Sequence, residues 1–301
     1  MTDVIVIGGG IIGLTAAVRL RQAGAAVRVW SPVGPAETVS AVAAAIWYPT
    51  RTEFDPRVRA WGRTTYDEFT RQAGTAPGVL LRRTRNLERE WHDEMPWWAP
   101  AGAEIVPGPE PYRREVRFTA PLVEMAAYLP WLAAQVTVER RAAGRLADAL
   151  AEAPVVVNAA GLAAGRLCGD DAVYPARGQI VLVRNPGLDT SVRAEGDPSA
   201  YVHPRSADVV LGGTFEVGER SLEPDPATRD AIVARCVALV PELAGAEMLG
   251  EKVGLRPCRR GGPRVERDGA VVHAYGHCGA GMTLCWGTAD EVTRLVTDAG
   301  R

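Results

Sequence analysis

The sequence predicts an α/β (α+β) protein of about two domains, on three observations. The first thirty residues follow a strand, glycine loop, helix and strand pattern, which is typical of a parallel βαβ unit. Short apolar segments with strand-like patterning recur later and alternate with helical ones. The 301 residues accommodate about two hydrophobic cores, and 47% hydrophobic with 23% charged residues is ordinary for a globular protein.

The βαβ unit begins with the β-branched apolar run of residues 3–7, which predicts a buried strand. Apolar residues at helical spacing over 14–20 predict a helix ended by Gly24, and residues 26–30 predict a second strand. The loop between them has the spacing G-x-G-x-x-G, which places a pyrophosphate at a helix N-terminus. We therefore expect dinucleotide binding by the loop residues Gly8, Gly9, Gly10, Ile11, Ile12 and Gly13.

The second strand lacks one element of this pattern. It runs into Trp30-Ser31-Pro32, without the Asp or Glu that would accept a hydrogen bond from a ribose hydroxyl. We expect the ribose contact from Ser31, from the main chain or from a later residue such as Ser40.

The remaining elements are predicted from periodicity and turn residues. Helices are expected over residues 55–74, 122–135 and 225–239, and from about residue 282. Strands are expected over residues 154–161, 177–183, 208–213 and 270–274. Residues 88–111, dense in Trp and Pro, are expected to be irregular.

Charge and hydropathy argue against two classes of partner. The net charge is −2, and the arginines are scattered rather than gathered in a basic stripe, so we expect no nucleic-acid and no membrane binding. No apolar run reaches the roughly 20 residues of a membrane span. The first apolar stretch lacks the basic start of a signal peptide, and the chain end is not a peroxisomal Ser-Lys-Leu. We expect a bacterial cytoplasmic protein.

The cysteines and histidines indicate no metal site. The five cysteines show no CxxC spacing, so we expect free buried thiols, with a bridge between Cys236 and Cys285 as the alternative. The histidines His203, His273 and His277 lack metal-ligand spacing with carboxylates, and no G-x-S-x-G motif is present. We interpret these histidines as structural or close to a cofactor.

Four further segments carry a resemblance to a known family. They are residues 42–49, residues 201–204 leading into 212–215, residues 254–259 leading into 264–266, and residues 273–283 leading into Trp286-Gly287. In this order the chain resembles the D-amino-acid oxidase family of FAD-dependent amine oxidoreductases, over residues 2–296. The segments Gly-Leu-Arg-Pro and Tyr-Gly-His are the most specific, because the glycine loop alone would fit many unrelated enzymes.

The resemblance implies a Rossmann-like FAD-binding domain and a discontinuous substrate domain on a mostly antiparallel sheet. The FAD domain would comprise residues 1–50, 140–180 and 250–301, and the substrate domain residues 51–139 and 181–249. FAD would be bound non-covalently, and the small residues of 43–45 would let the main chain approach its ring. Beyond the glycine loop, the implied cofactor contacts are Ser31, Ser40, Ala44, Ala45, Ile46, Leu162, Cys278, Gly279, Ala280, Gly281, Met282 and Thr283.

The resemblance also implies the substrate contacts. Arg256 would bind the substrate carboxylate with two parallel hydrogen bonds, helped by the hydroxyl of Tyr201, and the carbonyl of Gly279 would accept the amine. Phe215 stands where some relatives have a second tyrosine, so it can pack against the substrate but cannot donate. The residues implied near the substrate side chain are Ile46, Tyr48 and Thr50, and core packing is an equal alternative for them.

The implied reaction is oxidative deamination of a D-amino acid by dioxygen. The substrate Cα–H would leave as hydride to flavin N5, giving a 2-oxo acid, ammonia and hydrogen peroxide, with no side-chain acid or base. A short segment before Tyr201 predicts no long lid, and a homodimer is expected.

Three alternatives stay open. A D-aspartate oxidase would need a further cation in the pocket, for which Arg205 or Arg82 are the candidates. A glycine or sarcosine oxidase would share the flavin, whereas a dinucleotide-binding protein without oxidase activity would keep only the glycine loop.

Overall fold

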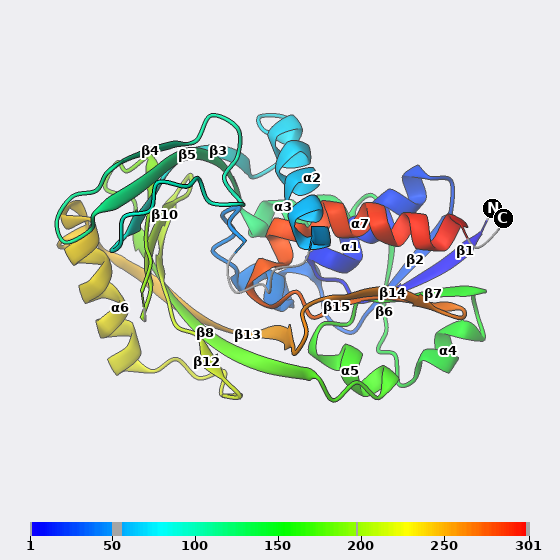
Figure 1. Ribbon diagram of the computed structural model, residues 1–301. Helices are drawn as coiled ribbons and strands as arrows, with labels where there is room; N and C mark the ends of the chain where they lie inside the picture. The colour runs from blue at the N-terminus through cyan, green and yellow to red at the C-terminus, as the bar shows by residue number, and fades with distance from the viewer. Residues whose placement is uncertain (1, 50–55, 197, 299–301) are drawn as a thin grey trace.

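The computed structural model describes residues 2–49, 56–196 and 198–298, so the predicted position Thr50 lies outside the described residues. The strands form two sheets (Figure 1), as expected for an α/β (α+β) fold. The first has the order β14-β15-β7-β1-β2-β6 and is parallel except for the β14–β15 pair. Its strands are β1 (Asp3–Ile7), β2 (Ala26–Ser31), β6 (Thr137–Arg140), β7 (Val155–Asn158), β14 (Arg264–Asp268) and β15 (Val271–Tyr275).

The second sheet has nine strands in the order β12-β8-β11-β10-β9-β3-β5-β4, with β13 also paired to β8. Every pair is antiparallel except β3 with β9, which confirms the predicted mostly antiparallel sheet. Its strands are β3 (Val79–Glu88), β4 (Glu104–Pro107), β5 (Arg114–Val123), β8 (Val173–Arg184), β9 (Thr190–Ala194), β10 (Ala200–Pro204), β11 (Asp208–Gly212), β12 (Glu216–Val217) and β13 (Met248–Arg259).

Helices cover both faces of the first sheet. The helices α1 and α7 lie on one side of it and α4 and α5 on the other, while α6 covers the outer face of the second sheet (Figure 1). The helices are α1 (Ile11–Gln22), α2 (Pro56–Gln72), α3 (Met125–Ala133), α4 (Leu146–Leu150), α5 (Leu162–Cys168), α6 (Pro226–Leu239) and α7 (Gly281–Thr297). The short 3-10 helices are η1 (Pro35–Glu37), η2 (Val39–Val42), η3 (Pro241–Leu243) and η4 (Cys278–Ala280).

Two element predictions are wrong. The helix expected over 122–135 starts only at Met125, because Leu122 and Val123 pair with β3 and extend β5. The stretch 88–111, expected to be irregular, contains β4, which pairs with β5. In both cases strand pairing with distant residues overrides the local pattern.

The two sheets divide the chain almost as the predicted domain ranges do. Two strands differ, because β6 belongs to the first sheet and β13 to the second. The strand β8 crosses the predicted boundary at residue 180. The division into two domains stays a prediction. Sheet membership places β6 in the first sheet, and β8 and β13 in the second.

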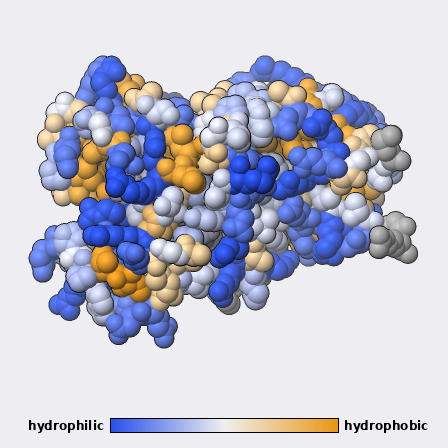
Figure 2. Space-filling view, turned by 90° about the horizontal axis from the view of Figure 1, so that it is seen from above, coloured by the Kyte–Doolittle hydropathy of each residue, from blue (hydrophilic) through white to orange (hydrophobic). Residues whose placement is uncertain are grey.

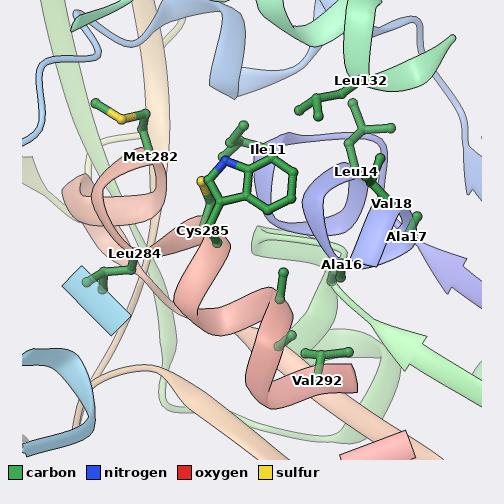
Figure 3. Packing of buried hydrophobic residues seen from close by; sticks show 14 of the residues in the cluster. Ile11, Leu14, Ala16, Ala17, Val18, Leu132, Met282, Leu284, Cys285 and Val292 are labelled. Carbon is green, nitrogen blue, oxygen red and sulfur yellow. The ribbon is translucent and has the colours of Figure 1, made fainter. Parts of the chain in front are cut away.

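The largest core lies where α1 meets α7. Small and branched residues of both helices pack with Leu132 of α3 and with strand residues on the face of the first sheet that the helices cover. In Figure 3 α1 and α7 lie side by side, with Cys285 of α7 near Ile11 of α1 and with Leu132 beside Leu14, whereas Met282 and Leu284 point away from α1. This core holds the N-terminal ends of both helices at one edge of the parallel sheet.

The prediction that all five cysteines are free is wrong, and so is the alternative bridge. Cys258 and Cys278 form a disulfide, whereas Cys168, Cys236 and Cys285 are free thiols. Cys236 lies in the core beneath α6 and Cys285 in the core between α1 and α7, so the two belong to different cores.

The surface is mixed in polarity. In the space-filling view, hydrophobic residues form separate patches among hydrophilic ones (Figure 2). Over the described ranges, no helix combines the length and the apolar character needed to cross a membrane.

The turn from β1 into α1 is the predicted dinucleotide loop, and its main-chain atoms come close to one another. Gly8 has a φ of 124° and its N–H donates to the Trp30 carbonyl over 2.9 Å. A Cβ on Gly13 would lie 1.9 Å from the Gly8 carbonyl oxygen, so no other residue fits without moving the helix away from the loop.

We predict that Gly13→Ala lowers the free energy of unfolding by about 2–3 kcal/mol, because the added methyl group has no space. It should also abolish retention of flavin, since the loop and the helix N-terminus separate. The measurements are urea unfolding and the flavin absorbance of the purified protein.

The matched control is Gly62→Ala in α2. Its added Cβ would meet side-chain atoms only at 3.7 and 3.9 Å, so helix propensity should leave stability unchanged or raise it by about 1 kcal/mol. Equal behaviour of the two variants would contradict the steric argument.

Candidate active site

One large cavity lies between the two sheets. It encloses about 1410 Å³ of atom-free space, including its open mouth. Its walls come from the start of α1, residues 39–48, the strands β8, β10 and β13, and the loop that enters α7. Segments separated by more than 200 residues therefore meet at this cavity. The predicted site residues that line it are Ile11, Ile12, Ser40, Ala44, Ala45, Ile46, Tyr48, Tyr201, Phe215, Arg256, Cys278, Gly279, Gly281, Met282 and Thr283.

The N-terminus of α1 opens at one end of the cavity. The helix has no acidic residue in its first turn, so its dipole and unpaired N–H groups favour an anion. The hydroxyl oxygen of Ser40 accepts a hydrogen bond from the Ile11 N–H over 3.0 Å, which holds η2 against the loop. Ser31 is buried instead and donates to the Val33 carbonyl over 2.7 Å. Of the two serines, Ser40 is the one that faces the cavity.

The small-residue segment is pinned by main-chain hydrogen bonds on both sides. The Ala45 carbonyl accepts from the Val123 N–H over 2.8 Å, and the Trp47 N–H donates to the Pro121 carbonyl over 2.7 Å. The Tyr48 N–H donates to the Thr283 hydroxyl over 3.2 Å. Residues 43–46 thus form a thin, fixed wall that a flat ring can approach closely.

The loop entering α7 forms another part of the cavity wall. The 3-10 helix η4 runs directly into α7, and Gly279 is exposed to the cavity while Ala280 is fully buried behind it. The disulfide from Cys258 to Cys278 ties this loop to β13. The N-terminus of α7 therefore points its N–H groups toward the cavity.

The guanidinium of Arg256 lies inside the cavity rather than in solvent. Its Nη1 donates to the carbonyls of Arg177 over 3.2 Å and Thr214 over 3.0 Å, and its Cζ lies 5.5 Å from the Phe215 ring centroid. A Cβ on Gly178 would lie 2.1 Å from Nη1, so the absence of a side chain there makes room for the guanidinium. Main-chain carbonyls fix the head group before a substrate arrives.

Tyr201 lies close enough to Arg256 for the charge of the guanidinium to act on its hydroxyl. Burial raises the pKa of this tyrosine, although the charges of Arg256 and Arg193 act in the opposite direction. Its hydroxyl is therefore protonated at neutral pH and is able to donate. The ring rests on the main chain at Gly212, where a Cβ would lie 1.9 Å from Cζ.

Arg193 is a site residue that sequence reasoning missed. It lies on β9 directly opposite Tyr201, and its guanidinium carbon lies 4.3 Å from the Tyr48 ring centroid. The Tyr48 hydroxyl donates to Glu195 over 2.6 Å. The segment expected to be too short for a lid, residues 186–193, enters strand β9 in its second half, and only strand pairing places Arg193 on the cavity wall.

The two cations proposed from the sequence lie elsewhere. Arg205 pairs through two nitrogens with Asp208, and the Arg82 Nε donates to the Pro204 carbonyl over 3.1 Å. Neither belongs to the described residues that line the cavity, so Arg193 supplies the second positive charge instead.

The three buried histidines are neutral at physiological pH. Burial lowers the pKa of His203 to about 3 and that of His277 to about 4, and it also lowers the pKa of His273. His203 stacks on Tyr201 with ring centroids 4.8 Å apart. No group of three or more His, Cys, Asp or Glu in the described part of the chain is arranged to hold a metal. These observations agree with a structural interpretation of the histidines.

Seven predicted cofactor residues do not line the cavity. Most of them belong to the glycine turn, to η4 or to the start of α5. They adjoin residues that line the cavity and so help to position those residues. They are Gly8, Gly9, Gly10, Gly13, Ser31, Leu162 and Ala280.

Several cavity residues were missed for a simple reason. His203 and His277, which the sequence analysis interpreted as structural or close to a cofactor, both line the cavity. Most of the missed residues carry no sequence signal, because apolar residues and glycines are typical of any core. The missed residues are Val39, Val42, Met125, Ala159, Gly161, Gly178, Ile180, Arg193, Ser199, Gly213, Thr214, Gly254, Pro257, Ala274, Tyr275 and Gly276.

A polar network supports the cavity wall at Tyr275. The Tyr275 hydroxyl donates to Asp170 over 2.8 Å, and the Arg259 Nε donates to the same oxygen over 2.8 Å. Burial alone would raise the pKa of Asp170, but the hydrogen bonds from Arg259 and Tyr275 lower it from 3.8 to about 2. The network joins the turn that follows α5 to the ends of β13 and β15.

We predict that Asp170→Asn costs about 1–2 kcal/mol of stability at pH 7, after allowance for solvent screening. Because the pKa is lower in the folded state, the unfolded state binds more protons as the pH falls. The wild-type advantage is therefore complete above about pH 4, and it disappears as the pH falls toward 2.

Urea unfolding at pH 7 and at decreasing pH measures this effect. The control Asp171→Asn changes the neighbouring carboxylate, which is exposed, and should alter stability little at either pH. A cost for Asp170→Asn that is independent of pH would contradict the assignment to its charge.

Comparisons with known proteins agree with this geometry. A family model described as FAD dependent oxidoreductase matches residues 3–295. The D-amino-acid oxidase of Rubrobacter xylanophilus is 43% identical over 314 residues, which covers 97% of this chain and 94% of that protein. Human D-aspartate oxidase is 33% identical, over 97% of this chain and 94% of its own length.

A solved structure shows the same fold. Glycine oxidase from Bacillus cereus superposes with a TM-score of 0.80 at 18% identity, covering 99% of this chain and 98% of that one. At this identity the likeness concerns the fold alone. The match of the family model to nearly the whole chain, together with the close relatives, shows that the chain belongs to the FAD-dependent oxidoreductase family.

Proposed function

We propose that the chain oxidises the α-amino group of D-amino acids with non-covalently bound FAD and dioxygen, releasing a 2-oxo acid, ammonia and hydrogen peroxide. The observation that carries this proposal is the guanidinium of Arg256, held inside the cavity by two main-chain carbonyls next to the Tyr201 hydroxyl. A planar fork of donors beside a protonated phenol suits an α-carboxylate.

The described residues fit an FAD. The compact turn that Gly13 permits brings the N-terminus of α1 to the cavity, where a pyrophosphate can lie, and Ser40 is in reach of a ribose. The pinned main chain of residues 43–46 and the loop that enters α7 would hold the ring between them. When bound, FAD supplies the acceptor for the hydride of the substrate Cα.

The protein residues orient the substrate rather than move protons. Arg256 and Tyr201 would hold the carboxylate, and the exposed main chain at Gly279 would accept a hydrogen bond from the amine. The neutral His203 and His277 are poor bases because burial lowers their pKa to about 3 and about 4. Once the carboxylate and the amine of the substrate are both held, the configuration at its Cα decides whether the hydrogen or the side chain faces the flavin ring.

We predict that Arg256→Ala lowers kcat/KM for D-alanine by about a hundred- to a thousand-fold, because two charge-assisted hydrogen bonds are lost. Arg256→Lys should recover only part of the activity, since it keeps the charge but not the fork. Peroxide release is the measurement, and flavin absorbance reports whether each variant still binds FAD.

The matched control is Arg205→Gln, which removes a guanidinium that pairs with Asp208 away from the cavity. It should leave kcat/KM within about twofold of the wild type. Release of peroxide from L-alanine, or from glycine or sarcosine in preference to D-alanine, would contradict the proposed substrate class. A colourless protein would contradict the flavin itself.

A second candidate, preference for acidic D-amino acids, is favoured by Arg193. Its guanidinium on the cavity wall, opposite Tyr201, offers a cation about one strand spacing from the carboxylate clamp. A second carboxylate on the substrate side chain would gain a charge-assisted hydrogen bond there.

We predict that Arg193→Gln lowers kcat/KM for D-aspartate by tenfold or more but that for D-alanine by less than about threefold. Arg193→Lys should restore part of the D-aspartate activity. An equal fall for both substrates would assign Arg193 to the support of Tyr48 and Tyr201 rather than to specificity.

The homodimer and the cytoplasmic location stay predictions from the sequence. Size-exclusion chromatography with light scattering on the flavin-loaded protein tests the first.

A further inference from the structure

The disulfide between Cys258 and Cys278 occupies an unusual place in the fold. Cys258 lies two residues after Arg256 on β13, and Cys278 directly precedes Gly279 in the loop that enters α7. A β-bridge between Cys258 and His277 runs alongside the bond. The pair thus joins the strand of the proposed carboxylate clamp to the loop of the proposed flavin site.

The two sulfur positions differ in access. Cys278 is half-buried and lines the cavity, whereas Cys258 is 1% exposed and lies behind it. A small oxidant formed in the cavity would therefore meet Cys278 first. Cys258, whose Cα lies 4.0 Å from that of Cys278, would be the partner that resolves the product.

The surroundings of Cys278 also favour its reactive form. It is the first residue of η4, which continues into the 17-residue helix α7, so the positive end of the helix dipole favours a thiolate over a thiol. Burial instead raises the pKa of Cys236 to about 11 and raises that of Cys285, and neither lines the cavity among the described residues.

We propose that Cys258 and Cys278 are a dithiol modification site that is oxidised to the disulfide by hydrogen peroxide, the product of the enzyme itself. This inference rests on the proposed oxidase activity. It explains how a disulfide forms at this site without an oxidising compartment, because the oxidant is released into the cavity that Cys278 lines.

The reaction balances in two steps. The Cys278 thiolate attacks one oxygen of the peroxide, the O–O bond breaks, and the second oxygen leaves as water after taking up the thiol proton. The Cys258 thiol then attacks the sulfenic sulfur, the S–O bond breaks, and a second water leaves with the Cys258 proton. Two thiols lose two electrons in total, and one peroxide becomes two water molecules.

Closure of the pair has a consequence for the cofactor. The bond joins the loop at Cys278 to the paired strand β13, which limits the loop's freedom to move before FAD binds. A loop that is already ordered binds its ligand at a lower entropic cost. We expect the reduced form to bind FAD about tenfold more weakly than the disulfide form.

The test starts from the flavin-loaded enzyme, reduced with dithiothreitol and desalted without oxygen. Samples receive D-alanine in air, D-alanine without oxygen, L-alanine in air, air alone, or one equivalent of hydrogen peroxide. Each is then denatured with iodoacetamide, and alkylated cysteines are mapped by mass spectrometry. We expect five alkylated cysteines to fall to three, with Cys258 and Cys278 lost, only with D-alanine in air and with peroxide.

Variants assign the order of events. In Cys258→Ser the reaction should stop at a sulfenic acid on Cys278 that dimedone traps, whereas Cys278→Ser should give no trapped product. The matched control Cys168→Ser should still lose two thiols, since Cys168 is free in the structure. A sulfenic acid on Cys258 instead, or rapid closure in air alone, would overturn the proposal.

The different samples distinguish failure of this inference from failure of the proposed function. If added peroxide leaves the pair reduced, the modification site is wrong whatever the enzyme oxidises. If peroxide closes the pair but D-alanine in air releases no peroxide, the oxidase proposal fails and the proposal of self-oxidation fails with it.

Flavin affinity tests the consequence separately, by fluorescence titration of the oxidised and the reduced wild type. Equal dissociation constants for the two forms would overturn the effect on the loop. In Cys258→Ser the constant should match the reduced form and should not respond to dithiothreitol.

Discussion

The active site depends on the antiparallel ladder between β8 and β13. This pairing runs from the pair of Met248 with Val183 to the pair of Arg259 with Val173, with one bulge between Met248 and Gly250, and sets Arg256 opposite Ala176 and Gly254 opposite Gly178. The guanidinium of Arg256 then folds over Gly178, where any Cβ would collide with it, and two main-chain carbonyls fix its direction. A shift of the ladder by one residue would turn Arg256 to the opposite face of the sheet and remove the cation from the cavity.

Burial sets the protonation of the polar groups around this cation. It keeps the hydroxyl of Tyr201 protonated and the imidazoles of His203 and His277 neutral, so the positive charges of Arg256 and Arg193 dominate the substrate end. Such a cavity attracts carboxylates, and the described residues that line it offer no strong base. In the proposed reaction the cofactor supplies the chemistry, and the protein holds and orients the substrate.

The cofactor end is built on a different constraint. Helices α1 and α7 pack tightly side by side, and their N-termini both open onto the cavity. One suits an anion such as pyrophosphate, and the other places the Cys278 loop beside the residues of β13. The disulfide links this end to the ladder of β8 and β13, so the two halves of the site are covalently connected.

The sequence by itself determined the local motifs. The glycine loop, the buried strand before it and the Arg256 motif are contiguous in the chain, and their chemistry depends on neighbours a few residues away. Tertiary structure decided which distant residues meet. It placed Arg193 opposite Tyr201, chose Ser40 over Ser31 at the cavity, extended β5 into a segment with a helical pattern, and paired Cys258 with Cys278 rather than Cys236 with Cys285. Such contacts depend on strand register and on which core each element joins, and neither is written in local periodicity.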